Sequence, residues 1–183
     1  MSKLIVDEIV DSNGNSLILG SVLQVQYTES NTRVDISAQD IVPITGLSVN
    51  ISPISATSKI LLEANIISNA YYVSSFGFAL GTTAQFTRLG GNTNINSANA
   101  ISTLFSYGDT YANSVVAFDA LSANMYSVTY RYLYTQTGSP SPLTFHPCAC
   151  SSWQGTLNTL RINDRAGNDM HSTSSITATE IVL

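Results

Sequence analysis

The strictest alternation of apolar and polar positions in this chain lies between residues 126 and 134. Tyr126, Val128, Tyr130, Tyr132 and Tyr134 occupy alternate positions, with Ser, Thr, Arg and Leu between them. Side chains of a β-strand switch faces with a period of two, so this segment predicts a strand with a continuous aromatic face. Because a monomer seldom leaves such a face in water, we expect a core, a sheet-packing surface or a subunit contact.

Further short runs of alternating residues recur along the chain between turn signals. They cover residues 47–51, 60–66, 76–80, 116–118, 160–162 and 175–183. Pro53, Gly81 and the segment Gly138–Pro142 interrupt the pattern after three of the predicted strands. No 3.6-residue period is sustained anywhere. The pattern therefore predicts an all-β sandwich or barrel.

We expect a short arm followed by one β-domain. Residues 1–30 would form the arm and a lead-in strand, and residues 31–183 the sandwich. The segment Lys3–Asp11 is strand-like and precedes a strong turn signal, Asp-Ser-Asn-Gly-Asn. The Asn- and Ser-rich segment Gly90–Asn113 predicts a long loop, where binding residues often lie. The final strand is apolar to Leu183, which indicates a place inside the sheet or in an oligomer.

Charge excludes some classes of partner. Only 10% of the residues are charged and the net charge is −5, with two lysines and five arginines scattered along the sequence. Such a chain offers no basic groove for nucleic acid. No apolar run is long enough to insert into a membrane as a helix, and the acids in MSKLIVDEIV argue against a secretory signal.

The sequence contains few groups for catalysis or metal binding. Cys148 and Cys150, with His146 nearby, make an incomplete zinc site, and the favoured interpretation is that both thiols fill apolar space. A Cys–His pair with His171 lacks an orienting acid. Oxygen ligands near Asp164, among them Asn168 and Asp169, do not match a calcium loop, so a hairpin turn is favoured. We expect no enzyme activity, no cofactor and no metal.

Four segments that together touch about half of the chain follow a familiar order. They are LIVDEIVDSNGN (residues 4–15), LSVNISPISATSKILL (47–62), FDALSANMYSVTYRY (118–132) and SSITATEI (174–181). In this order they resemble the tail-fibre-like and virion-decorating structural proteins of marine bacteriophages. Such proteins are typically jelly-roll-like antiparallel β-sandwiches that assemble as trimers. The resemblance implies the same fold here, with a short N-terminal strand arm, and a homotrimer.

The resemblance also implies a function. The chain would be a non-enzymatic virion protein, a trimeric fibre or knob that its arm attaches to a tail or capsid protein and that takes part in host-surface adsorption. It would be assembled in the host cytoplasm and released by lysis. A capsid decoration protein that stabilises the head is one alternative, and a soluble carbohydrate-binding module is another.

Three sets of residues are the candidates for these roles. The arm residues expected to dock onto the virion are Leu4, Ile5, Val6, Ile9 and Val10. The loop residues expected to face a receptor, such as a host surface glycan, are Tyr107, Tyr111 and Asn113. The residues expected at trimer contacts are Tyr130, Tyr132, Ile181 and Leu183.

Overall fold

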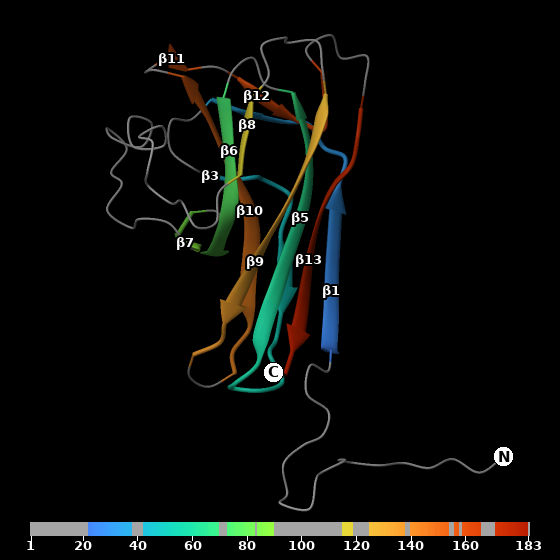
Figure 1. Cartoon of the computed structure of the whole chain (residues 1–183), viewed down its shortest axis with the longest axis vertical. Helices are drawn as coiled ribbons and strands as arrows, with labels where there is room; N and C mark the ends of the chain where they lie inside the picture. Colours follow the sequence, from blue (N-terminus) through green and yellow to red (C-terminus); the bar gives the residue numbers. More distant parts are fainter. Residues whose placement is uncertain are drawn as a thin grey trace, which may run out of the picture.

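The chain folds as an antiparallel β-sandwich of two sheets, as the computed structural model shows (Figure 1). The structure describes residues 22–37, 42–69, 73–82, 84–89, 115–118, 125–137, 140–153, 156–157, 159–165 and 171–182. These ranges contain thirteen strands and no helix. In this part of the chain there is accordingly no helix that would suit a membrane span.

The first sheet has four strand positions, two of which are interrupted strands. It contains β1 (Val22–Ser30), β2 (Val34–Ile36), β5 (Lys59–Asn69), β9 (Tyr126–Thr135), β12 (Leu160–Ile162) and β13 (Ser174–Ile181). β5 pairs with β9 on one side and with β13 and β12 on the other. β1 and β2 pair in turn with β13 and β12. β1 is therefore an integral strand of the sandwich, at its edge.

The second sheet is built around two long central strands. It contains β3 (Val42–Pro43), β4 (Val49–Ile51), β6 (Val73–Gly81), β7 (Phe86–Leu89), β8 (Val115–Phe118), β10 (Leu143–Trp153) and β11 (Thr156–Leu157). β10 and β6 pair with each other. β3, β4 and β11 extend the sheet beyond β10, and β7 and β8 extend it beyond β6.

The strand order is that of a jelly roll. Counting the interrupted strands as single positions gives eight, in chain order β1/β2, β3/β4, β5, β6, β7/β8, β9, β10 and β12/β13. The first sheet then has the order one, eight, three, six, and the second sheet two, seven, four, five. This arrangement of two interlocked Greek keys is the jelly-roll topology. The predicted fold class is confirmed; the predicted arm, in residues 1–21, lies outside the described residues.

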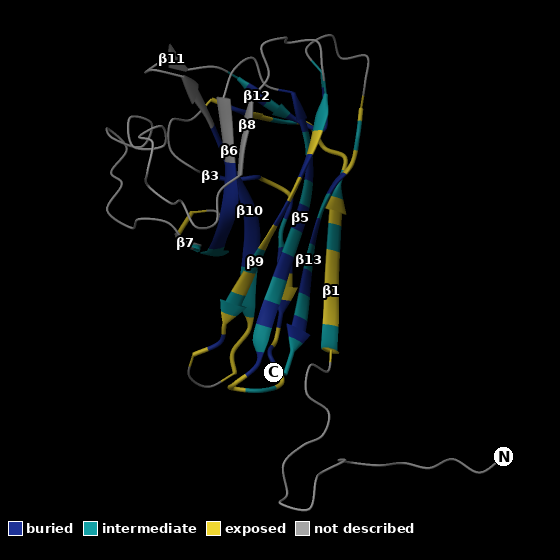
Figure 2. Ribbon diagram, viewed as in Figure 1, coloured by how far each residue is buried: buried dark blue, intermediate teal, exposed yellow. Residues whose placement is uncertain are grey.

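The core lies between the two sheets, where alternate residues point inward. On β5 the inward residues Ile60, Leu62, Ala64 and Ile66 are at most 1% exposed, and the burial colours alternate along the strand in Figure 2. Burying each large side chain of this kind contributes about 1.5–3 kcal/mol. The alternation read from the sequence thus identified the inner face of this strand.

The tyrosine face of β9 is part of this core. Tyr130 is 5% exposed, and its ring lies 4.7 Å from that of Phe78 in the second sheet. Its hydroxyl donates a hydrogen bond to the Gly77 carbonyl oxygen, at 3.1 Å. Tyr134 contacts Phe145 of β10 edge-on, with ring centroids 5.2 Å apart. Of the three roles expected for this face, the described contacts support packing between sheets.

A single asparagine joins the two interrupted strands of the first sheet. Asn163 follows β12 with φ at 62°, a left-handed conformation that Asn adopts more readily than most residues. Its Nδ2 donates to the carbonyl oxygens of Ser30 and Thr32, at 2.7 and 3.1 Å. Its Oδ1 accepts from Ser174 Oγ at 2.6 Å. The side chain thus links β12 to the end of β1 and the start of β13.

Candidate functional site: the outer face of the first sheet

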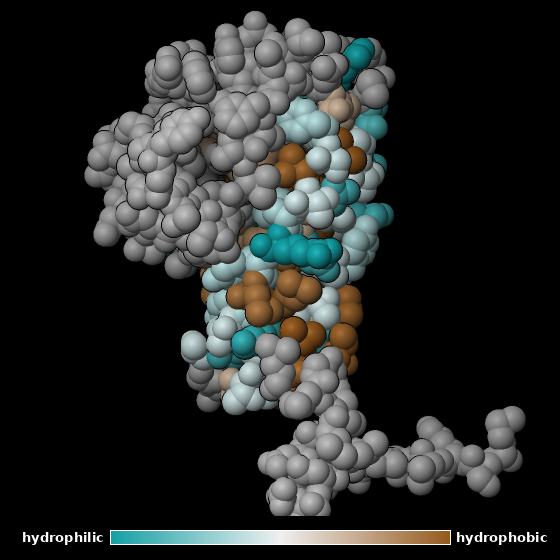
Figure 3. Space-filling view, viewed as in Figure 1, coloured by the Kyte–Doolittle hydropathy of each residue, from teal (hydrophilic) through white to brown (hydrophobic). Residues whose placement is uncertain are grey.

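The outer face of the first sheet presents side chains in regular rows across β1, β13, β5 and β9. The first row holds Val22, Ile181, Lys59 and Thr135; the second holds Val25, Thr179, Leu61 and Leu133; the third holds Tyr27, Thr177, Glu63 and Arg131. Apolar side chains gather in the first two rows and at one corner of the third. Figure 3 shows them over the lower half of this face.

We call this group the apolar band. It consists of Val22, Val25, Tyr27, Leu61, Leu133 and Ile181. Val22, Val25 and Tyr27 are 54–57% exposed and Leu133 is 43% exposed, so the described chain leaves much of the band in contact with solvent. Only one other large apolar side chain in the described part of the molecule, Ile54, is equally open. Neighbouring exposed apolar side chains of this kind make the band the candidate interaction surface of the described chain.

The apolar band arises because the pattern of β1 is reversed. An edge strand of a sandwich normally points its apolar residues toward the core. In β1 the inward positions are polar, among them Gln24 and Gln26, whereas Val25 and Tyr27 point outward. The register leaves no doubt about the direction, since Gln24 pairs with the buried Glu180 and Val25 with the outward Thr179.

The charged groups of the same face balance one another. Arg131 Nε lies 2.5 Å from Glu63 Oε1, and the other charged side chains that the described residues of β1, β13, β5 and β9 present here are Lys59 and Glu29. Two positive and two negative groups give these four strands a formal outer-face charge of zero, although the whole chain carries −5. Asn65 accepts hydrogen bonds from Ser127 and Thr129 on β9. Across these four strands the face is therefore apolar in its first two rows and carries balanced charges beside them.

The inner side of β1 contributes to the hydrogen bonding of a buried carboxylate, Glu180, beneath the apolar band. Glu180 of β13 is fully buried, and its carboxylate accepts hydrogen bonds from Gln24 Nε2 and Ser58 Oγ, both at 2.6 Å. The backbone amides of Ile54 and Ser55 donate to it as well, at 2.8 and 3.2 Å. Burial raises the pKa of Glu180, but these hydrogen bonds outweigh that effect and hold the pKa below its ordinary value.

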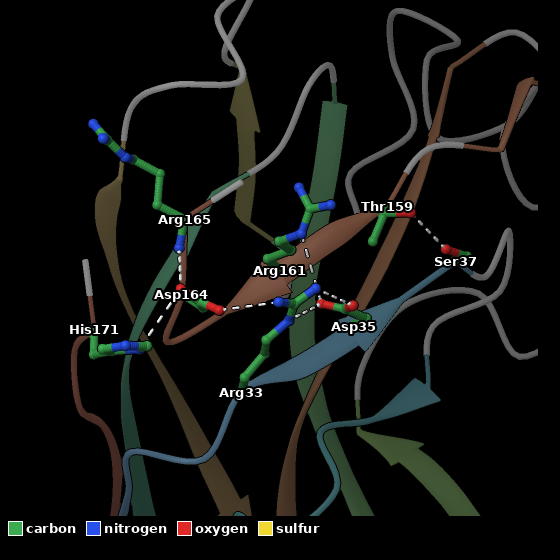
Figure 4. Close-up of polar contacts among 8 residues, drawn as sticks. All are labelled: Arg33, Asp35, Ser37, Thr159, Arg161, Asp164, Arg165 and His171. Atoms are coloured by element: carbon green, nitrogen blue, oxygen red, sulfur yellow. Dashed lines mark hydrogen bonds and ion pairs between the residues drawn. The ribbon is translucent and has the colours of Figure 1, made fainter. Parts of the chain in front are cut away.

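A charged cluster lies at the other end of the first sheet (Figure 4). The Arg33 guanidinium makes two hydrogen bonds to Asp35, at 2.9 and 2.7 Å, and one to Asp164 at 3.2 Å. Arg161 Nε lies 3.9 Å from Asp35 Oδ1. The hydrogen bonds from Arg33 lower the pKa of Asp35. Three of the five arginines that are scattered in the sequence, Arg165 included, thus gather at one end.

Asp164 is the buried member of this cluster. Its side chain is 2% exposed; its Oδ1 accepts from the Arg165 amide at 2.7 Å and lies 3.6 Å from His171 Nδ1. The turn that the sequence favoured over calcium binding continues through Asn168 and Asp169, which lie outside the described residues. In the described ranges no three His, Cys, Asp or Glu side chains are placed to hold a metal ion.

The two cysteines lie beside His146 but apart from His171 in the fold. Cys148 and Cys150 are buried on β10 in the second sheet and form no disulfide. His146, on the same strand, is 5% exposed and has Nε2 2.8 Å from the Gly81 carbonyl oxygen. His171 is paired with Asp164 beside the first sheet. The structure therefore places the cysteines and His171 on different sheets.

The predicted site residues fall into two groups. Tyr130 points into the core, Tyr132 packs against it, and Ile181 lies on the outer face in the apolar band. The arm residues, the loop residues and one trimer-contact residue lie outside the described residues: Leu4, Ile5, Val6, Ile9, Val10, Tyr107, Tyr111, Asn113 and Leu183. The trimer contact itself stays a prediction, and Ile181 is the one candidate for it that is described on the outer face.

Sequence reasoning missed three features of these surfaces. Val25 and Tyr27 alternate with glutamines in the sequence, but alternation does not say which side faces the core. Nothing in the sequence of β13 marked Glu180 as a buried carboxylate. The arginine cluster required the pairing of β2 with β12, which are more than a hundred residues apart.

Comparison with known proteins adds no relative. No model of a protein family matches the sequence, and no curated protein matches it.

Proposed function

We propose that this chain is a non-enzymatic structural protein of a bacteriophage particle. In this proposal it forms a homotrimeric knob or short fibre, its N-terminal arm attaches it to another virion protein, and the sandwich takes part in adsorption to the host. The apolar band is the observation that carries the proposal. An otherwise polar, charge-poor protein with a neutral, partly apolar sheet face is suited to lasting association with protein.

The chemistry of the described residues supports a structural role. The carboxylates of Glu180, Asp164 and Asp35 are all engaged in holding strands and turns together. The jelly roll also supports the proposal, because this topology is common in viral capsid proteins, although a fold by itself does not establish a function.

Purified phage particles whose genome encodes this chain provide the direct test. We expect mass spectrometry to find the chain in the particles, and immunogold labelling to place it at the tail. Labelling of the head would favour the alternative, a capsid decoration protein. Absence of the chain from particles, together with its presence in the infected cell, would contradict both.

A truncated chain that lacks residues 1–15 tests the attachment by the arm. We expect it to fold, with the circular dichroism spectrum of the full chain, and to be lost from the particles. A full-length chain with Ile54→Lys, a change on an exposed turn, is the matched control and should stay on the particles. Occupancy of particles by the truncated chain would eliminate docking through the arm.

A further inference from the structure

We infer that copies of this chain associate through the outer face of the first sheet, with the apolar band at the centre of the contact. The partner that this face fits is a second copy of the chain. The inference deepens the proposed function, which expects an oligomer but names no contact surface, and it depends on that function only for this expectation.

The reversed pattern of β1 is the first argument. Because polar residues of β1 face the core, Val25 and Tyr27 lie on the outer face, where each is more than half exposed. No described residue buries them there. The polar residue Gln24 on the inner side of β1 has a role within the chain, because it donates a hydrogen bond to the buried Glu180. The apolar residues on the outer side have no such explanation, because a polar residue in either position would suit an exposed strand equally well. They require a surface that covers them.

Position in the sheet is the second argument. In the described part of the molecule β1 ends the first sheet, so one of its two edges has no strand beside it. The apolar band begins on this edge strand and continues through Ile181 and Leu61 to Leu133 on the opposite edge. A partner that covers the band therefore meets the whole width of the sheet, rather than a single strand.

Charge selects a second copy as the partner. Two chains that each carry −5 repel one another over most approaches. The part of the outer face formed by β1, β13, β5 and β9 is formally neutral in the described residues and presents both signs, with Arg131 and Lys59 matched by Glu63 and Glu29. The same face on another copy offers opposite charges to each of these groups. Two copies can thus associate through this face without additional electrostatic repulsion. The four charged side chains around the apolar band can orient one copy relative to the other.

The test is the native mass of the full chain, measured by light scattering after size-exclusion chromatography over a hundredfold range of concentration. We expect the wild-type chain to be an oligomer. Val25→Lys and Leu133→Lys should each give a monomer of about 19.6 kDa, because a lysine would be buried without a partner. Both substitutions make the net charge less negative, so greater repulsion cannot explain a loss of association.

Ile54→Lys is the matched control. Ile54 is 64% exposed and lies on the turn between β4 and β5, which is not one of the strands that form the rows of the outer face; its amide donates to Glu180 on the inner side. The same apolar-to-lysine change there should leave the oligomer intact. A wild-type monomer at every concentration would overturn the inference, and so would Lys variants that keep the wild-type mass.

A conservative pair of substitutions covers the case in which the lysine variants fail to fold. Val25→Thr and Leu133→Thr place β-branched threonine, a good strand former, on both exposed strand positions. Together they should raise the dissociation constant of the oligomer at least about tenfold, with an unchanged circular dichroism spectrum. An unchanged dissociation constant would overturn the inference.

The outcomes separate the inference from the proposed function. A mass of three times 19.6 kDa that falls in the variants supports both. A dimer that dissociates in the variants supports the contact surface and contradicts the trimer. An oligomer that the substitutions leave intact, on a chain that is found in particles, retains the proposed function and rejects this surface.

Discussion

Glu180 and Asp164 are two buried carboxylates at opposite ends of the first sheet, and the chain neutralises them differently. Glu180 accepts hydrogen bonds from neutral donors: the side chains of Gln24 and Ser58 and two backbone amides. Asp164 also accepts from an amide, but its other partners are the Arg33 guanidinium and His171. One charge is held by dipoles alone, and the other is also paired with the charge of Arg33.

The difference follows the surfaces around each group. Glu180 lies beneath the end of the sheet that carries the apolar band, and the donors named there are all neutral groups. Asp164 lies at the end where three arginines gather (Figure 4). The lesson is that a buried carboxylate needs satisfied lone pairs more than it needs a cation. Three predictions test this comparison.

The largest effect is expected from Glu180→Ala. The substitution leaves the backbone amides of Ile54 and Ser55 without their acceptor and opens a cavity, so the free energy of unfolding should fall by about 4 kcal/mol. Urea denaturation at a fixed chain concentration measures it. Glu180→Gln keeps one acceptor oxygen, and the Gln24 amide can turn to match it. It should therefore cost about half as much.

Glu29→Ala is the control for this pair. Glu29 is exposed on β1 and accepts a hydrogen bond from the Tyr27 hydroxyl at 2.7 Å. Its removal should leave the free energy of unfolding nearly unchanged. An equally small effect of Glu180→Ala would show that the dipoles around Glu180 do not stabilise the fold.

An intermediate effect is expected from Asp164→Asn. The amide keeps an acceptor for the Arg165 backbone but loses the attraction of Arg33, and the free energy of unfolding should fall by about 2 kcal/mol. A double-mutant cycle with Arg33→Met isolates the pair. Its coupling should weaken in 1 M NaCl, because Arg33 is partly exposed, whereas the cost of Glu180→Gln should not change with salt. A coupling energy that does not change with salt would contradict the proposed difference between the ion-paired Asp164 and the Glu180 carboxylate with its neutral donors.

The smallest effect is expected from pH. The pKa of Glu180 in the folded chain lies below its ordinary value of 4.5. Its contribution to stability is therefore complete above pH 4.5 and is lost as the pH falls through the folded-state pKa. Between pH 6 and pH 3 the wild-type chain should lose its advantage over Glu180→Gln, by at most about 1.4 kcal/mol per pH unit. Parallel urea midpoints for the two chains across this range would contradict the lowered pKa.

The positions of the strictly alternating strands could be predicted from the sequence. Residues 60–66 were assigned the correct inner face, because one face of the strand is apolar and the other is largely polar. For residues 126–134 the alternation predicted the strand, but it left open whether the tyrosine face is a core, a sheet-packing surface or a subunit contact. The pattern was less informative for β10. Its residues Phe145 to Cys150 are all buried, so both faces are apolar or small and no alternation marks them. β1 alternates well, but alternation does not specify direction.

Which side chains of distant strands contact one another depends on the tertiary structure. The pairing of β1 with β13 turned Gln24 toward Glu180 and Val25 toward the outside, and a shift of one residue would have exchanged them. The pairing of β2 with β12 brought Arg33 to Asp164 across 131 positions of the chain. The apolar band likewise combines residues from four strands. Local patterns fix the faces of a strand, but its neighbours and register depend on contacts between distant segments, and these determine the sites.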